Sequence, residues 1–155
     1  MSKDFTYLYN NFIILTSNKN LYRGLDQQDK FSDRLMILLI HFAFFFKIFK
    51  NKMNNKLLQE IYDFNFRQLE LSIREIGYGD QSINKKMKDY INICHAIISE
   101  IHFWDEMKYD KKKIFLSNFL YNFKNIDYLI EYFEDFNVNL KKYDLNSYLK
   151  SVNKS

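Results

Sequence analysis

The chain of 155 residues contains no proline and only three glycines, two of which stand within the stretch Gly77-Tyr78-Gly79. Proline breaks helices, so its absence leaves long helical patterns uninterrupted and requires other residues to make the turns. Glycine enters the left-handed region without the ~1–2 kcal/mol that a Cβ costs there. Because glycine is so rare in this chain, we expect the stretch to fix a particular corner between two helices.

Helical periodicity is the dominant pattern along the chain. The apolar spacing predicts helices over residues 4–17, 29–50, 56–76 and 82–107, and shorter ones near 111–123, 126–136 and 145–152. The second of these is apolar nearly all round, which predicts a position at the centre of a bundle. We see no alternating strand pattern, internal repeat or low-complexity linker. We therefore predict an all-α, single-domain helical bundle of about six to seven helices over residues 1–155.

The expected corner has residues that suit the end of one helix and the start of the next. Gly77 is placed to end the helix over 56–76 as a glycine just past the last turn. Asp80 or Ser82 can cap the free amide groups of the following helix. If that helix continues unbroken to Met107, it is about 39 Å long at ~1.5 Å per residue.

Composition and charge exclude several classes of protein. A formal net charge of +4 permits attraction to anionic lipid, ribosome or nucleic acid but requires none of them. The single cysteine, Cys94, excludes an internal disulfide framework. The longest apolar run, residues 35–46, is too short to span a bilayer. The first residues fit neither a secretory signal nor a mitochondrial presequence, so we expect a cytosolic protein or one peripheral on a membrane.

Few residues are arranged for catalysis or metal binding. His41 lies within the most apolar helical pattern, and we favour a core histidine that is hydrogen-bonded to a neighbouring helix. Cys94 and His95 diverge by ~100° around a helix, and His95 and His102 share a face but are two turns apart. The two glycines follow a helix and not a strand, so they do not form a dinucleotide-binding loop. We predict no enzyme, no metal site and no cofactor; a haem-handling protein that uses one of these histidines stays open as an alternative.

Two groups of lysines suggest another alternative. Lys85, Lys86 and Lys88 lie after the corner, and Lys111-Lys112-Lys113 lie further along the chain. Most such runs are solvated helix faces, and we favour that interpretation. If they form one basic patch, the chain is a small helical module that binds the ribosome or nucleic acid, without recognition of specific DNA.

The charges in the last turn before the corner predict a local ion pair. Arg74 is favoured there by the helix dipole, whereas the carboxylate of Glu75 is not. We therefore expect Glu75 to be stabilised by Arg74 or by a lysine of the next helix. Lys85 is expected to meet a carboxylate across the corner.

Two stretches carry a resemblance to a known family. The first runs from Asp29 to His41 and contains Arg34, a hydrophobic run and the histidine. The second is Arg74-Glu75-Ile76-Gly77-Tyr78-Gly79-Asp80, followed by Lys85-Lys86-Met87. In their order and spacing, these stretches resemble the ubiquinol-cytochrome c chaperone family, over roughly residues 20–105.

The resemblance implies a non-enzymatic assembly factor of respiratory complex III that binds newly made cytochrome b. A bundle with an apolar face could shelter apolar segments of an unfinished membrane protein. Basic residues could hold it against an anionic membrane surface or the ribosome. The absence of a presequence pattern adds the expectation of a bacterial protein, peripheral on the cytoplasmic face of the inner membrane. We expect the binding surface to be formed by the helices over 29–50 and 56–76 together with the glycine corner. The expected binding residues are Arg34, His41, Arg74, Glu75, Gly77, Gly79, Asp80, Lys85 and Met87.

Overall fold

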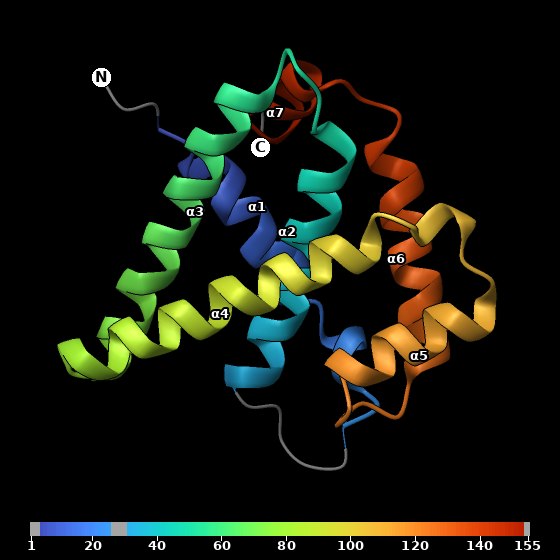
Figure 1. Ribbon diagram of the computed structural model, residues 1–155, viewed down its shortest axis with the longest axis horizontal. Coiled ribbons are helices and arrows are strands. Elements are labelled where there is room, and N and C mark those ends of the chain that lie inside the picture. Colours follow the sequence, from blue (N-terminus) through green and yellow to red (C-terminus); the bar gives the residue numbers. More distant parts are fainter. Residues whose placement is uncertain (1–3, 26–30, 154–155) are drawn as a thin grey trace.

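The computed structural model describes residues 4–25 and 31–153. The elements of this part are α1 (Thr6–Thr16), η1 (Lys19–Tyr22), α2 (Phe31–Phe49), α3 (Asn55–Ile76), α4 (Asp80–Ile101), η2 (Trp104–Glu106), α5 (Tyr109–Phe119), α6 (Ile126–Leu140) and α7 (Leu145–Asn153), where η marks a short 3-10 helix. The prediction of an all-α bundle is confirmed (Figure 1). The expected start of the second helix, near Asp29, lies outside the described residues. No described helix has both the length and the apolar character needed to cross a membrane.

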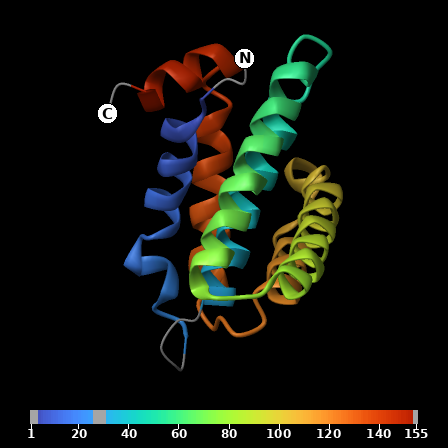
Figure 2. The same ribbon diagram turned by 90° about the vertical axis from the view of Figure 1, so that its left-hand side faces the viewer.

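Helix α2 is the centre of the bundle, as its sequence predicts. Helices α1, α4 and α6 all pack against it (Figures 1 and 2). Most of its 19 residues are buried. Its phenylalanine rings meet neighbouring rings edge to face, as between Phe42 and Phe12 of α1, whose centres are 5.0 Å apart. Edge-to-face pairs of this kind stabilise a core beyond the burial of their apolar area.

Helices α3 and α4 are joined by the glycine turn, but only one of its two glycines has a left-handed backbone. Gly77 has φ 107° and ends α3, and its N–H donates to the carbonyl of Arg74 at 3.0 Å. Gly79 has φ −76° and is the residue before the first turn of α4. A Cβ at either position would meet open space. The backbone therefore requires glycine at position 77 and tolerates a side chain at position 79.

The prediction of an unbroken helix to Met107 is wrong, because α4 ends at Ile101. The chain then turns, and η2 carries Trp104 into the core, where its ring centre lies 5.1 Å from that of Phe44. Trp104 falls three residues after Ile101 and continues the apolar stripe of α4. The sequence pattern therefore does not reveal the break.

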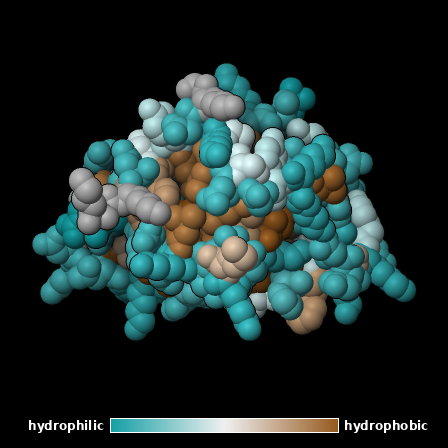
Figure 3. Space-filling view, turned by 90° about the horizontal axis from the view of Figure 1, so that it is seen from above, coloured by the Kyte–Doolittle hydropathy of each residue, from teal (hydrophilic) through white to brown (hydrophobic). Residues whose placement is uncertain are grey.

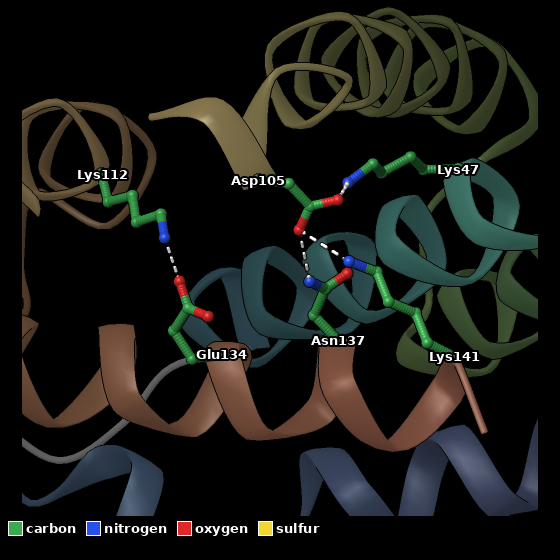
Figure 4. A network of polar contacts seen from close by, with 6 residues as sticks. All are labelled: Lys47, Asp105, Lys112, Glu134, Asn137 and Lys141. Atoms are coloured by element: carbon green, nitrogen blue, oxygen red, sulfur yellow. Dashed lines mark hydrogen bonds and ion pairs between the residues drawn. The ribbon is translucent and has the colours of Figure 1, made fainter. Parts of the chain in front are cut away.

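The last third of the chain is tied to the rest by polar contacts as well as by packing. Asp105 of η2 accepts hydrogen bonds from Lys141 at 2.8 Å, from Asn137 at 2.9 Å and from Lys47 at 3.2 Å (Figure 4). Burial raises the pKa of Asp105, but these three donors outweigh it and lower the pKa to about 2. One carboxylate thus joins α2, η2 and the end of α6.

The third glycine of the chain, Gly24, lies against Asn125. This contact was not predicted from the sequence. A Cβ on Gly24 would lie 2.2 Å from the side-chain oxygen of Asn125. The carbonyl of Gly24 accepts a hydrogen bond from the N–H of Lys124 at 2.9 Å, beside an isolated bridge between Leu25 and Phe123. The chain after η1 is thereby fixed against the start of α6.

Candidate functional site

His41 is a residue of the core, as we favoured from the sequence. Its Nε2 lies 2.7 Å from the hydroxyl of Tyr132 and its Nδ1 2.8 Å from the carbonyl oxygen of Ile37. Burial lowers its pKa to about 4, so the ring is neutral near pH 7. A neutral ring can donate from Nδ1 to the carbonyl and accept at Nε2 from the tyrosine. Both nitrogens are thus engaged and the side chain is fully buried, so it has no exposed atom with which to touch a partner.

Two other expected binding residues are not exposed together with the rest. Met87 is buried on the inner face of α4. Arg34 is exposed at the start of α2, where its guanidinium carbon lies 5.8 Å from the centre of the Tyr22 ring of η1.

The remaining expected binding residues are brought together in the α3–α4 corner, which we define as residues 71–88. They are all exposed, and they are Arg74, Glu75, Gly77, Gly79, Asp80 and Lys85. Figure 1 shows the corner projecting at the lower left, and Figure 2 shows it nearest the viewer. Six of the nine residues expected to bind a partner are therefore exposed together in this corner.

The roles expected of the charged corner residues need correction. The Nη1 atom of Arg74 lies 2.5 Å from Oδ1 of Asp80, and Nη2 lies 3.8 Å from Glu70. Asp80 is thus the partner of Arg74 across the turn, and its side chain does not cap α4. Among the described residues neither Glu75 nor Lys85 forms an ion pair, so the partners expected for them were wrong.

Apolar side chains add to the charges of the corner. Leu71, Ile76 and Tyr78 are 47%, 52% and 41% exposed. The ammonium of Lys86 lies 4.6 Å from the centre of the Tyr78 ring, a cation–π distance. Single exposed apolar residues are common on proteins, but three between positions 71 and 78 make the end of α3 and the following turn both apolar and charged.

At the other end of α4 is an apolar pocket that the sequence analysis missed. Its volume is about 520 Å³, and its lining includes Phe103, Met107, Ile114 and Phe115. Phe103 and Ile114 are 60% and 62% exposed. The pocket exists because the chain turns after Ile101, so treating residues 82–107 as one helix concealed it. We call it the apolar pocket.

Apolar side chains reach the surface at one further place. Figure 3 views the molecule from the side on which Figure 1 places α7 and the loop between α2 and α3. Hydrophobic side chains form the bottom of a hollow near the middle of this face, inside a rim of hydrophilic ones. Some apolar side chains of the bundle are therefore exposed to solvent on this face.

The lysines after Tyr109 are largely engaged within the protein. Lys112 pairs with Glu134 of α6 (Figure 4) and lies 4.8 Å from the centre of the Trp104 ring. Lys113 lies 3.5 Å from Asp127. This run is therefore a bridge between α5 and α6, which weakens the alternative of a basic patch made from both lysine groups.

The described residues offer little for catalysis or metal binding. Cys94 is fully buried, and burial raises the pKa of its thiol to about 12, so it carries no reactive thiolate near neutral pH. In residues 4–25 and 31–153 no group of three or more potential ligands could hold a metal ion.

Comparison with known families agrees with the two stretches noted in the sequence. The model of the family described as ubiquinol-cytochrome C chaperone matches residues 23–101, which are 79 of the chain's 155 residues. The match takes in α2, α3, the corner and α4, and it ends at the last residue of α4. No curated protein and no solved structure was found to match. The chain belongs to the ubiquinol-cytochrome C chaperone family.

Proposed function

We propose that this chain binds cytochrome b during the assembly of respiratory complex III and that the α3–α4 corner makes part of the contact. The observation that carries the proposal is the family match over residues 23–101, because it contains the corner and the helices that position it.

The distribution of apolar surface supports this proposal. A chaperone for an unfinished membrane protein needs apolar surface that stays open to solvent until the client arrives. The corner and the apolar pocket lie at opposite ends of α4. A helix of 22 residues is about 33 Å long at ~1.5 Å per residue. This is close to the ~30 Å of a membrane-spanning segment, so one such segment could reach both ends of α4.

The exposed charges of the corner support a place beside the membrane. Lys85 and Lys88 are exposed in the first half of α4, within the corner. Lysines near a membrane contribute about 1 kcal/mol each toward binding anionic lipid. We propose that the chain acts as a peripheral protein where cytochrome b is inserted, at the cytoplasmic face of a bacterial inner membrane. Attachment to the ribosome is the alternative that the same lysines would serve.

Capture of cytochrome b from cells tests the proposal. The tagged chain is crosslinked in cells and purified, and cytochrome b is identified in the product by mass spectrometry. We expect the wild type to recover cytochrome b and the Ile76→Ser/Tyr78→Ser variant to recover much less. Tyr121→Ser is the matched control, because Tyr121 is 81% exposed and lies outside the corner and outside the family match.

The two possible failures have different meanings. No recovery by the wild type would contradict binding of cytochrome b. Equal recovery by the corner variant and the control would contradict the part assigned to the corner. Deletion of the gene should also lower the cytochrome b absorbance and the quinol oxidation activity of membranes.

A further inference from the structure

Two adjoining cavities open between the end of α2, the start of α3 and the second half of α4. Their volumes are about 420 Å³ and 650 Å³, and Lys50, Asn55 and Ile98 line both of them. We call the two cavities together the basic groove. Their lining lies within residues 46–102, so it coincides almost entirely with the part of the chain that the family model matches.

The floor of the basic groove is apolar and firmly packed. Phe46 and Tyr62 lie with ring centres 5.7 Å apart, and Leu58 is buried beside them. The hydroxyl of Tyr62 lies 3.1 Å from Nε2 of His95, which joins α3 to α4 across the groove.

One face of α4 makes a wall of this groove. His95, Ile98 and His102 follow at spacings of three and four residues, so they point to the same side of the helix. The wall extends about 10 Å from His95 to His102 at ~1.5 Å per residue. Two turns of a partner helix would fill this length.

The charged side chains that line the basic groove are all positive. Lys47, Lys50 and Lys52 are its charged side chains, and among the residues that the structure describes no carboxylate lines either cavity. Lys47 is paired with Asp105 at 3.2 Å. Lys50 and Lys52 are exposed, and neither forms an ion pair within the described part of the chain. A ligand that enters the groove therefore meets an apolar floor and two lysines without a carboxylate partner.

We propose that the basic groove binds an acidic amphipathic peptide segment of a partner protein. Its apolar face would cover Phe46, Leu58 and Ile98, and its carboxylates would meet Lys50 and Lys52. Charge complementarity selects an acidic ligand, and the concave shape suits a peptide better than a flat lipid surface. The inference goes beyond the proposed function, because it defines a ligand by its chemistry and does not require that ligand to be cytochrome b.

The test uses a short amphipathic helical peptide of leucine, alanine and glutamate with a fluorescent label. Two matched peptides carry glutamine or lysine in place of glutamate. Binding to the full chain is measured by fluorescence anisotropy at low salt. We expect the glutamate peptide to bind most tightly, with an affinity that falls as salt is added.

Variants of the two lysines assign the binding to the groove. Lys50→Gln/Lys52→Gln should weaken binding of the glutamate peptide about tenfold. The control Lys19→Gln/Lys108→Gln removes the same charge from exposed positions outside the groove and outside the corner, and it should change the affinity less than twofold. Lys50→Glu/Lys52→Glu should reverse the preference, so that the lysine peptide binds best. Reversal of preference also shows that the variant is folded.

Three results would overturn the inference. One is equal binding of the glutamate and glutamine peptides, and another is an equal loss in the groove and control variants. The third is binding of phosphatidylglycerol vesicles through Lys50 and Lys52 without binding of any peptide. These outcomes are independent of the proposed function: cytochrome b could still be captured when no acidic peptide binds, and the peptide could bind when no cytochrome b is captured.

Discussion

The two stretches that carry the family resemblance lie in opposite surroundings. On α2, His41 is fully buried, with both ring nitrogens hydrogen-bonded. In the α3–α4 corner, Arg74 and Tyr78 are exposed, and the main polar link is the ion pair between Arg74 and Asp80. The comparison teaches that residues of one family pattern can divide into those that hold the core and those left accessible to a partner.

The difference in surroundings predicts a difference in response to mutation. Changes on α2 should lower the free energy of unfolding and affect binding only through loss of the fold. Changes to the exposed side chains of the corner should affect binding with little loss of stability.

The largest expected effect is that of His41→Ala. The substitution leaves a cavity among Phe133, Phe136 and Tyr132 and leaves the tyrosine hydroxyl without its histidine partner. We expect the free energy of unfolding to fall by about 3–4 kcal/mol, measured by urea denaturation. Arg74→Ala is the comparison from the corner and should leave the urea midpoint nearly unchanged. A loss at His41 no larger than that at Arg74 would break the contrast.

The pH dependence of the free energy of unfolding should reveal the shifted titration of His41. Burial lowers the pKa of His41 from 6.5 to about 4, so the unfolded chain binds a proton in this range that the folded chain does not. Stability is therefore retained above pH 6.5 and falls as the pH drops toward 4, by about 3 kcal/mol in all. Urea midpoints measured across this range should slope for the wild type. His41→Gln cannot titrate there, and a slope equal to that of the wild type would contradict the assignment.

Loss of the Asp105 carboxylate should have a smaller effect. Asp105→Ala removes two lysine contacts and the acceptor for Asn137, which is buried. Because the Asp105 side chain is 42% exposed, solvent screens its ion pairs, and we expect a loss of about 1–2 kcal/mol. Thermal unfolding followed by circular dichroism measures it. Glu106→Ala is the neighbouring control, and an equal effect of both changes would show that the contacts of Asp105 contribute little.

The smallest expected difference is that between alanine substitutions at the two glycines of the corner. Gly77 has φ 107°, so Gly77→Ala should cost about 1–2 kcal/mol. Gly79 has φ −76° and open space around it. Alanine is less favourable than glycine at the N-cap of a helix, but it also lowers the entropy of the unfolded chain, so Gly79→Ala should change stability by less than ~0.5 kcal/mol. Equal effects, measured by urea denaturation, would show that the left-handed turn at Gly77 is not what shapes the corner.

Much of the fold could be predicted from the sequence because local patterns of apolar residues determine it. The apolar spacing located the helices, and the continuous apolar character of residues 35–46 placed α2 at the centre. Gly77 was correctly expected to end α3. The end of α4 was missed because Trp104 keeps the helical spacing after the helix has stopped.

The surfaces proposed for binding were harder to predict because they are assembled by packing. The corner is contiguous in sequence, so the turn at Gly77 was expected, although the ion pair between Arg74 and Asp80 was not. The basic groove combines Lys50, Tyr62 and His95 from three helices. Only the crossing of α3 and α4 over the end of α2 brings them together, and helical periodicity does not define crossing angles.

Site-specific photocrosslinking tests directly whether the corner contacts cytochrome b. A photoreactive amino acid replaces Tyr78 in the corner, and in a separate variant it replaces Tyr121, which is exposed but outside the corner. After irradiation in cells, we expect a covalent product with cytochrome b from position 78 and none from position 121. Equal products from both positions, or no product from position 78 while the protein is folded, would contradict it.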